Sequence, residues 1–241
     1  MANRTTVIDT LGTLADDDVT AILLPVQTGC LGYFELGGTL VRSQRNWVNP
    51  ALTATVVGSP TVAADGVTSI GNSAYFNTGI AEPLALTYLL AYKGTQLVST
   101  DPATSMIGNY GTGGAMLTGG WTGSPGNATV GFWSAGMPTQ TTADGAPGAW
   151  RLLAARVDPV TGIRINNLTL GTGPALAAPT GTRTVNARNI FLGWGGHTGF
   201  VGPNKIIRAA IYNRFLTDDE LATMRAFIAA EVAAIDPAIV L

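Results

Sequence analysis

The strongest constraint in this sequence is a capped helix near its end, predicted over residues 217–234. Thr217 and Glu220 form a T-x-x-E capping box, in which each side chain satisfies the free backbone N–H of the other residue. Asp218 and Asp219 place negative charge at the positive end of the helix dipole. Apolar residues recur at helical spacing, at Leu221, Met224, Phe227, Ile228 and Val232. The helix should therefore dock through one face.

Two short runs with β-strand character precede this helix. Residues 190–192 are apolar and close on Gly193, and residues 206–213 combine β-branched and aromatic side chains up to the helix cap. The predicted order is strand, loop, strand, helix.

This order resembles the end of laminin G-like, or concanavalin A-like, jelly-roll domains. Such domains end with a strand closing on glycine, a loop, a strand of the form I-x-x-A-x-I-Y-N-R, and then L-[ST]-x-x-E-[IL]. The matching positions here are Leu192-Gly193, Ile207, residues 210–214 and residues 216–221. Residues 73–93 and 150–170 are similar to earlier strands of the same family, so the three matches span roughly residues 70–230 in the expected order.

The resemblance implies an all-β fold, a concanavalin A-like jelly-roll β-sandwich with one C-terminal α-helix. Trp150 opens a matched strand and is expected in the core. Asn166-Asn167 stands where the family usually has Asn-Gly, which predicts a type I′ turn at that point. An alternating run at residues 84–93 predicts a strand whose core face carries Leu84, Leu86, Tyr88, Leu90 and Tyr92.

The 241 residues contain no long Pro/Ser-rich linker, which favours one principal domain. We expect residues 46–241 to form the sandwich, including its helix. Residues 1–45 precede the family match, and two interpretations remain open for them: an attachment arm, or extra edge strands of the same sandwich. Cys30 is the single cysteine, so no disulfide is possible within the chain, and it is expected to act as a small buried apolar group.

Charge limits the classes of partner. The net charge is −2 and only 12% of the residues are charged, so there is no basic patch for nucleic acid or anionic lipid. Apolar residues are dispersed, and no stretch approaches the roughly 18 residues of a membrane-spanning helix. A surface with so little charge tolerates being covered, which favours a homo-oligomer; a robust monomer is the alternative.

The first residues lack the apolar segment of a secretory signal, so synthesis in the cytoplasm is expected. A lectin-like sandwich of this kind is similar to bacteriophage virion proteins, namely tail fibres, head fibres, spikes and decoration proteins. The resemblance therefore implies location in the virion, with other virion proteins as partners.

Catalysis is not expected. Glycan-cleaving enzymes of this fold carry an E-x-D-x-E strand, whose alternate residues reach one cleft; the sequence contains no such motif. The four glutamates are Glu35, Glu82, Glu220 and Glu231, and the aspartates Asp65, Asp101 and Asp144 show no distinctive spacing. No cofactor or metal is predicted, and the run of aspartates at residues 16–18 is interpreted as a solvated cap or turn rather than a Ca²⁺ site.

Carbohydrate binding requires only an aromatic platform and a few hydrogen-bonding groups. The candidate contact residues lie in or near glycine-rich segments and are Trp121, Trp133, Trp194, His197, Asn109 and Tyr110. The alternative for each tryptophan is a lid over the end of the sandwich. The H-x-N-x-R strand of galectin-like lectins does not occur at His197, the single histidine.

The leading functional hypothesis is a tail or head fibre or spike component of a bacteriophage virion that binds a host-surface glycan. The alternative is a capsid decoration protein that stabilises the shell, and a glycan hydrolase comes third.

Overall fold

The computed structural model describes residues 22–94, 102–119, 129–143 and 148–241. Within these residues the chain forms two antiparallel sheets of seven strands each. Sheet A contains β12 (Gly162–Asn167), β11 (Trp150–Asp158), β6 (Leu86–Gly94), β14 (Pro203–Tyr212), β4 (Gly66–Ile70) and β3 (Thr61–Ala63) in that order, with β1 (Cys30–Glu35) also paired to β14. Sheet B contains β10 (Gln140–Ala143), β9 (Thr129–Ser134), β8 (Ala115–Gly119), β7 (Thr104–Gly108), β13 (Asn189–Leu192), β5 (Tyr75–Ala81) and β2 (Thr55–Val57).

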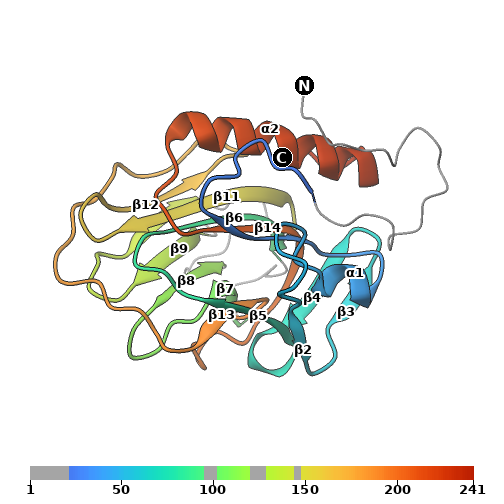
Figure 1. Cartoon of the computed structure of the whole chain (residues 1–241), viewed down its shortest axis with the longest axis horizontal. Helices are drawn as coiled ribbons and strands as arrows, with labels where there is room; N and C mark the ends of the chain where they lie inside the picture. The colour runs from blue at the N-terminus through green and yellow to red at the C-terminus, as the bar shows by residue number, and fades with distance from the viewer. Residues whose placement is uncertain (1–21, 95–101, 120–128, 144–147) are drawn as a thin grey trace.

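Helix α2 (Asp218–Ile235) lies across sheet A, on the side away from sheet B (Figure 1). The short helix α1 (Leu40–Gln44) and a 3-10 turn at Gly71–Ser73 complete the described elements. The layers are therefore helix, sheet A and sheet B. This is the predicted jelly-roll sandwich with one long C-terminal helix.

Strand β6 shows why sheet A sits in the middle. Leu86, Tyr88, Leu90 and Tyr92 point into the core between the two sheets, whereas Leu89 and Ala91 point toward α2. Both faces of the strand are buried, so apolar residues occupy both sets of alternating positions. Leu84 was expected in the core but is 54% exposed, because the strand begins only at Leu86.

The predicted helix is confirmed, including its cap. Thr217 and Glu220 make both hydrogen bonds of the capping box, and the buried face of α2 includes all five predicted apolar residues. Leu216, just before the cap, is fully buried in the same cluster as Leu221. Trp150 is buried in this second core, between sheet A and the helix, as expected.

The predicted turn at Asn166-Asn167 is wrong. These residues end β12, where Asn167 pairs with Leu153 of β11. The chain turns only after Asn167, which exchanges backbone hydrogen bonds with Thr172, whereas the β11–β12 hairpin closes separately where the Asp158 carboxylate accepts hydrogen bonds from the N–H groups of Val160 and Thr161. No non-glycine residue in the described ranges has a positive φ, which a type I′ turn at the asparagines would require.

The N-terminal part of the described chain contacts the sandwich directly. β1 pairs with β14, and Leu24 is buried in the core beneath α2. Cys30 is partly buried, and burial raises the pKa of its thiol to about 12, so the thiol is protonated at neutral pH.

Neither α1 nor α2 is long and apolar enough to cross a bilayer, and these are the α-helices of the described residues.

Candidate functional site

The candidate site lies on the outer face of sheet B, the face opposite the inter-sheet core. Phe76, Leu117 and Phe132 point into that core. Because strand side chains alternate, their neighbours Tyr75, Met116 and Trp133 point outward. Sheet B therefore presents aromatic and apolar side chains on a face that α2 does not cover.

The loop of residues 193–202 folds back over this face. Gly193 has a φ of +88°, and a Cβ there would lie 2.1 Å from the hydroxyl of Ser69, so only glycine fits where the chain leaves β13. The Gly195 N–H donates to Ser105 Oγ at 2.8 Å. The Tyr110 N–H donates to the Gly195 carbonyl at 2.7 Å, so this loop and the loop after β7 are joined through their backbones.

Arg188 clamps the two loops together. Its guanidinium donates to the Tyr110 carbonyl at 3.0 Å and to the carbonyls of Asn109 and Gly196 at 3.3 Å. The buried Asn109 returns a hydrogen bond from Nδ2 to the Arg188 carbonyl at 2.7 Å. These bonds fix both loops to the start of β13, so the surface above them is preorganised.

Trp194 forms the base of the site. Its ring is buried and stacks on Phe191, with ring centroids 5.1 Å apart, and it also contacts Tyr75. The indole Nε1 donates to the His197 carbonyl at 3.2 Å. Trp194 therefore holds the loop in place from beneath.

Three neighbouring rings come from these two loops: the exposed His197 and the half-buried Tyr110 and Phe200. The His197 ring is exposed and lies 6.2 Å from Tyr110 and 5.4 Å from Phe200, centroid to centroid. Its Nδ1 accepts a hydrogen bond from the Gly199 N–H at 3.0 Å, which leaves Nε2 as the protonated nitrogen of the neutral ring. The hydroxyls of Thr112 and Thr198 belong to exposed residues of the same two loops. We call Tyr110, His197 and Phe200 the aromatic loop surface.

The structure brings four of the six predicted contact residues together: Asn109, Tyr110, Trp194 and His197. Trp133 lies on the same face of sheet B but further along it. It pairs with Met116, over which Gly195 packs, and its Nε1 donates to Thr118 Oγ1 at 3.3 Å. Trp121 lies outside the described residues.

Sequence reasoning missed Arg188 and Phe200. Phe200 stands three residues after His197, and an aromatic residue directly after Gly-Gly-His-Thr-Gly was the available signal. Arg188 offered no local signal, because its partners lie 78 and 79 residues earlier in the chain.

All four glutamates are engaged in ion pairs. Glu82 is buried beside the site and pairs with the buried Arg183 at 2.5 Å. Burial raises the pKa of Glu82, which the Arg183 guanidinium opposes. Glu35 pairs with Arg42, Glu220 with Arg214 and Glu231 with Arg208.

Among the aspartates, Asp65 pairs with Lys205, whereas Asp101, Asp144 and residues 16–18 lie outside the described ranges. Those ranges contain no group of three acidic, cysteine or histidine side chains that could hold a metal.

No family model and no curated protein matches the chain. Solved structures do match. A mutant of Trypanosoma rangeli sialidase displaying trans-sialidase activity aligns with a TM-score of 0.58 at 14% identity, over 85% of this chain and 33% of that one. The binding domain of Paraclostridial Mosquitocidal Protein 1 aligns with a TM-score of 0.58 at 10% identity, over 81% and 52%. The receptor binding domain of botulinum neurotoxin C/D mosaic serotype aligns with a TM-score of 0.57 at 8% identity, over 80% and 50%.

These likenesses show the fold alone. The chain spans between a third and about half of the length of these proteins. They support the all-β sandwich seen in the two sheets.

Proposed function

We propose that this protein is a carbohydrate-binding component of a bacteriophage virion, in a tail or head fibre or spike, which binds a host-surface glycan. The observation that carries the binding role is the aromatic loop surface. Tyr110, His197 and Phe200 are neighbours on two loops that Arg188 and Trp194 hold in place. Rings held in this way stack on the apolar face of a sugar, and the neighbouring threonine hydroxyls supply hydrogen bonds.

The similar structures support this role. One similar structure is a Trypanosoma rangeli sialidase in complex with sialic acid, and two others are a binding domain and a receptor binding domain. The virion setting rests on the resemblance of the sequence to phage fibre, spike and decoration proteins, together with a surface that carries little charge. In that setting the chain forms a homo-oligomer and contacts other virion proteins.

Binding can be tested with a glycan array that includes bacterial surface polysaccharides. Tyr110→Ala and Phe200→Ala should each weaken binding at least tenfold, because each removes a stacking ring. Phe215→Ala is the matched control, since Phe215 is a half-buried ring that packs against Arg156 in sheet A. The binding proposal is wrong if no glycan binds, or if all three variants lose affinity equally.

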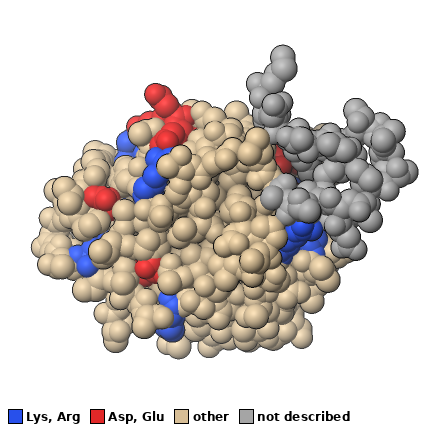
Figure 2. Space-filling view, viewed as in Figure 1, with Lys and Arg blue, Asp and Glu red and all other residues tan. Residues whose placement is uncertain are grey.

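A capsid decoration protein is the second candidate. Figure 2 shows a face on which most side chains are uncharged; some acidic and basic groups lie over one end of helix α2, and others are scattered over the rest of the face. A surface with so little charge tolerates being covered, as in a protein that lies flat on a shell.

Imaging of assembled particles with this chain labelled separates the two candidates. A fibre or spike projects from the particle, whereas a decoration protein lies on the shell and its loss lowers particle stability. A label that never appears on a virion contradicts both.

A glycan hydrolase is the third candidate, and the sialidase neighbours are the observation that favours it. Against it stands the engagement of all four glutamates with arginines. Release of reducing ends from host polysaccharide, abolished by substitution of an acidic residue in protein that remains folded, would establish the hydrolase and overturn the purely binding role.

A further inference from the structure

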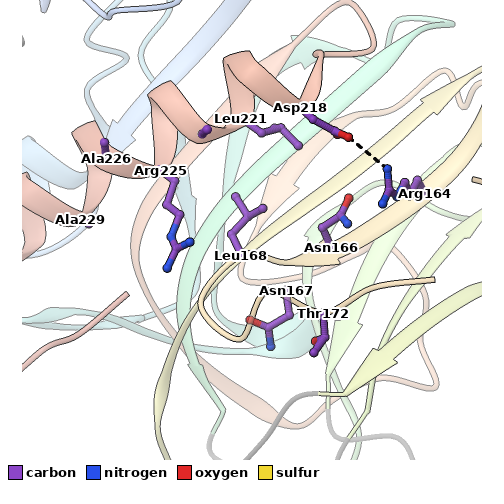
Figure 3. Close-up of a pocket in the computed structure, with 12 residues that line it drawn as sticks. Arg164, Asn166, Asn167, Leu168, Thr172, Asp218, Leu221, Arg225, Ala226 and Ala229 are labelled. Atoms are coloured by element: carbon purple, nitrogen blue, oxygen red, sulfur yellow. Dashed lines mark hydrogen bonds and ion pairs between the residues drawn. The ribbon is translucent and has the colours of Figure 1, made fainter. Parts of the chain in front are cut away.

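A cavity of about 490 Å³ lies between helix α2 and the end of β12 with the turn that follows it (Figure 3). Helix α2 covers sheet A, so this cavity is on the side of the sandwich away from the aromatic loop surface. Its volume is within the usual range for small-molecule sites. It is lined by Arg164, Asn166, Asn167, Leu168, Thr172, Asp218, Leu221 and Arg225 with small side chains of the helix and Gly171.

One wall of the cavity is apolar. Leu221 is buried in the core beneath the helix, and Leu168 packs against the same core. Ala222, Ala226 and Ala229 line the helix side, so the helix leaves space where larger side chains would fill it. A compact apolar ring could lie between the two leucines and these alanines.

Positive charge gathers around this apolar wall. The Asp218 carboxylate pairs with Arg156 at 2.7 Å and with Arg164 at 3.3 Å, so both of its oxygens are already in use. Arg225 extends from α2 beside Leu168 (Figure 3) and makes no hydrogen bond or ion pair with any described residue. Arg164 and Arg225 line the cavity and Arg156 lies beside it, so these three guanidinium groups and the one carboxylate of Asp218 leave a local excess of two positive charges.

A neutral donor completes the set. Asn166 Oδ1 accepts a hydrogen bond from Arg156 at 2.9 Å, which orients the amide and leaves its NH₂ group as a donor at the cavity wall. The polar groups at the cavity are thus mainly donors, and they favour an acceptor-rich anion. A carboxylate matches the planar fork of a guanidinium through two parallel hydrogen bonds.

We propose that this cavity binds a small organic anion: a carboxylate attached to a single compact ring. Arg225 takes the carboxylate, Asn166 donates to it or to a ring substituent, and the ring lies against Leu168 and Leu221. The proposal is independent of the glycan-binding function, because it uses no residue of the aromatic loop surface.

Titration calorimetry or NMR titration of the full chain can test this site with defined probes. Benzoate and glucuronate are the two ring carboxylates, one apolar and one a sugar acid, and the stronger binder identifies the ring class. Glucose, benzylamine and sulfate are the controls for the ring without charge, the ring with the wrong charge, and the charge without a ring. We expect at least one ring carboxylate to bind with a Kd below about 10 mM. This Kd should be at least tenfold lower than that of every control.

Two pairs of variants locate the binding. Arg225→Gln should weaken binding at least tenfold, whereas Arg225→Lys should weaken it less because the charge remains. Ala226→Leu should abolish binding by filling the cavity, whereas Ala230→Leu, at an exposed helix position outside the lining, should not. Thermal unfolding checks that each variant is folded.

The proposal is wrong if neither ring carboxylate binds with a Kd below about 10 mM, or if sulfate binds as tightly as the ring carboxylates. It is also wrong if binding survives both Arg225→Gln and Ala226→Leu in folded protein. Because glycan binding at Tyr110 and Phe200 is measured separately, failure of one site leaves the result for the other intact.

Discussion

Gly196 shows how much of the aromatic loop surface depends on a single residue. Its φ is +87°, and a Cβ would lie 2.7 Å from the carbonyl carbon of Asn109, which is backbone and cannot rotate away. Gly196→Ala should therefore cost about 1–3 kcal/mol of unfolding free energy and weaken glycan binding, because the loop must lift from residues 109 and 110. Denaturant unfolding and the glycan array measure the two effects.

Gly171 provides the matched control for this substitution. It also has a positive φ, +66°, but a Cβ there would meet nothing within 4 Å. Gly171→Ala should lower the unfolding free energy only by the backbone strain, about 1 kcal/mol, and should leave glycan binding unchanged. Equal losses in the two variants would mean that the contact with residues 109 and 110 does not hold the loop.

Single residues also explain why the site was only partly predictable. Tyr110, Trp194 and His197 stand in glycine-rich segments, which marked them as candidates. The burial of Trp194 beneath the loop depends on Phe191 and Tyr75, which belong to two different strands. Arg164 and Arg225 are 61 positions apart in the sequence, and nothing local indicates that they line one cavity.

At the scale of elements, local signals predicted more than long-range ones. The capping box of α2 is satisfied within four residues, so the sequence alone contains the information. The alternation of β6 is equally local, but its start is not: Leu84 continues the pattern and still lies outside the strand. The hairpin of β11 and β12 turns at Asp158, because the carboxylate binds two backbone N–H groups there, and the next turn follows Asn167, which pairs with Thr172.

The start of helix α2 should be sensitive to acid. Arg214 binds both carboxylate oxygens of Glu220, at 2.8 and 2.6 Å, and this pairing lowers the pKa of Glu220 from 4.5 to about 2. A lowered pKa in the folded state means that the stabilisation is present above pH 4.5 and is lost as the pH falls toward 2. Glu220→Gln should cost about 1 kcal/mol at pH 7, a modest value because the pair is partly exposed, and should flatten this acid dependence.

The test is urea unfolding at a series of pH values between 2 and 7, compared with Asp219→Asn. Asp219 lies in the same helical turn, so its substitution removes an equal charge without touching the Arg214 pair. We expect Asp219→Asn to change stability by less than about 0.5 kcal/mol and to keep the acid dependence. If both variants flatten it equally, helix-dipole charge rather than the ion pair is responsible.

At the scale of the whole molecule, a buried ionic network joins the N-terminal strand, the central sheet and the helix. Arg208 of β14 donates to Glu231 of α2 at 3.0 Å and lies 3.9 Å from Glu35 of β1. The Tyr33 hydroxyl donates to the same Glu231 oxygen at 2.5 Å. All of these side chains are almost fully buried, so their charges are stable only together.

Arg208→Met should therefore destabilise the protein by about 3–5 kcal/mol, because it leaves the Glu231 carboxylate buried without its cation. The double variant Arg208→Met/Glu231→Leu should recover part of this loss, since both charges are then removed. Arg164→Met is the control for an exposed pair and should cost less than about 1 kcal/mol. Denaturant unfolding of the wild-type protein, Arg208→Met, Glu231→Leu and the double variant closes a double-mutant cycle, in which the buried effects persist at high salt. A double variant as unstable as the sum of the two single changes would show that Arg208 and Glu231 act independently, and that their ion pair does not hold β14 and α2 together.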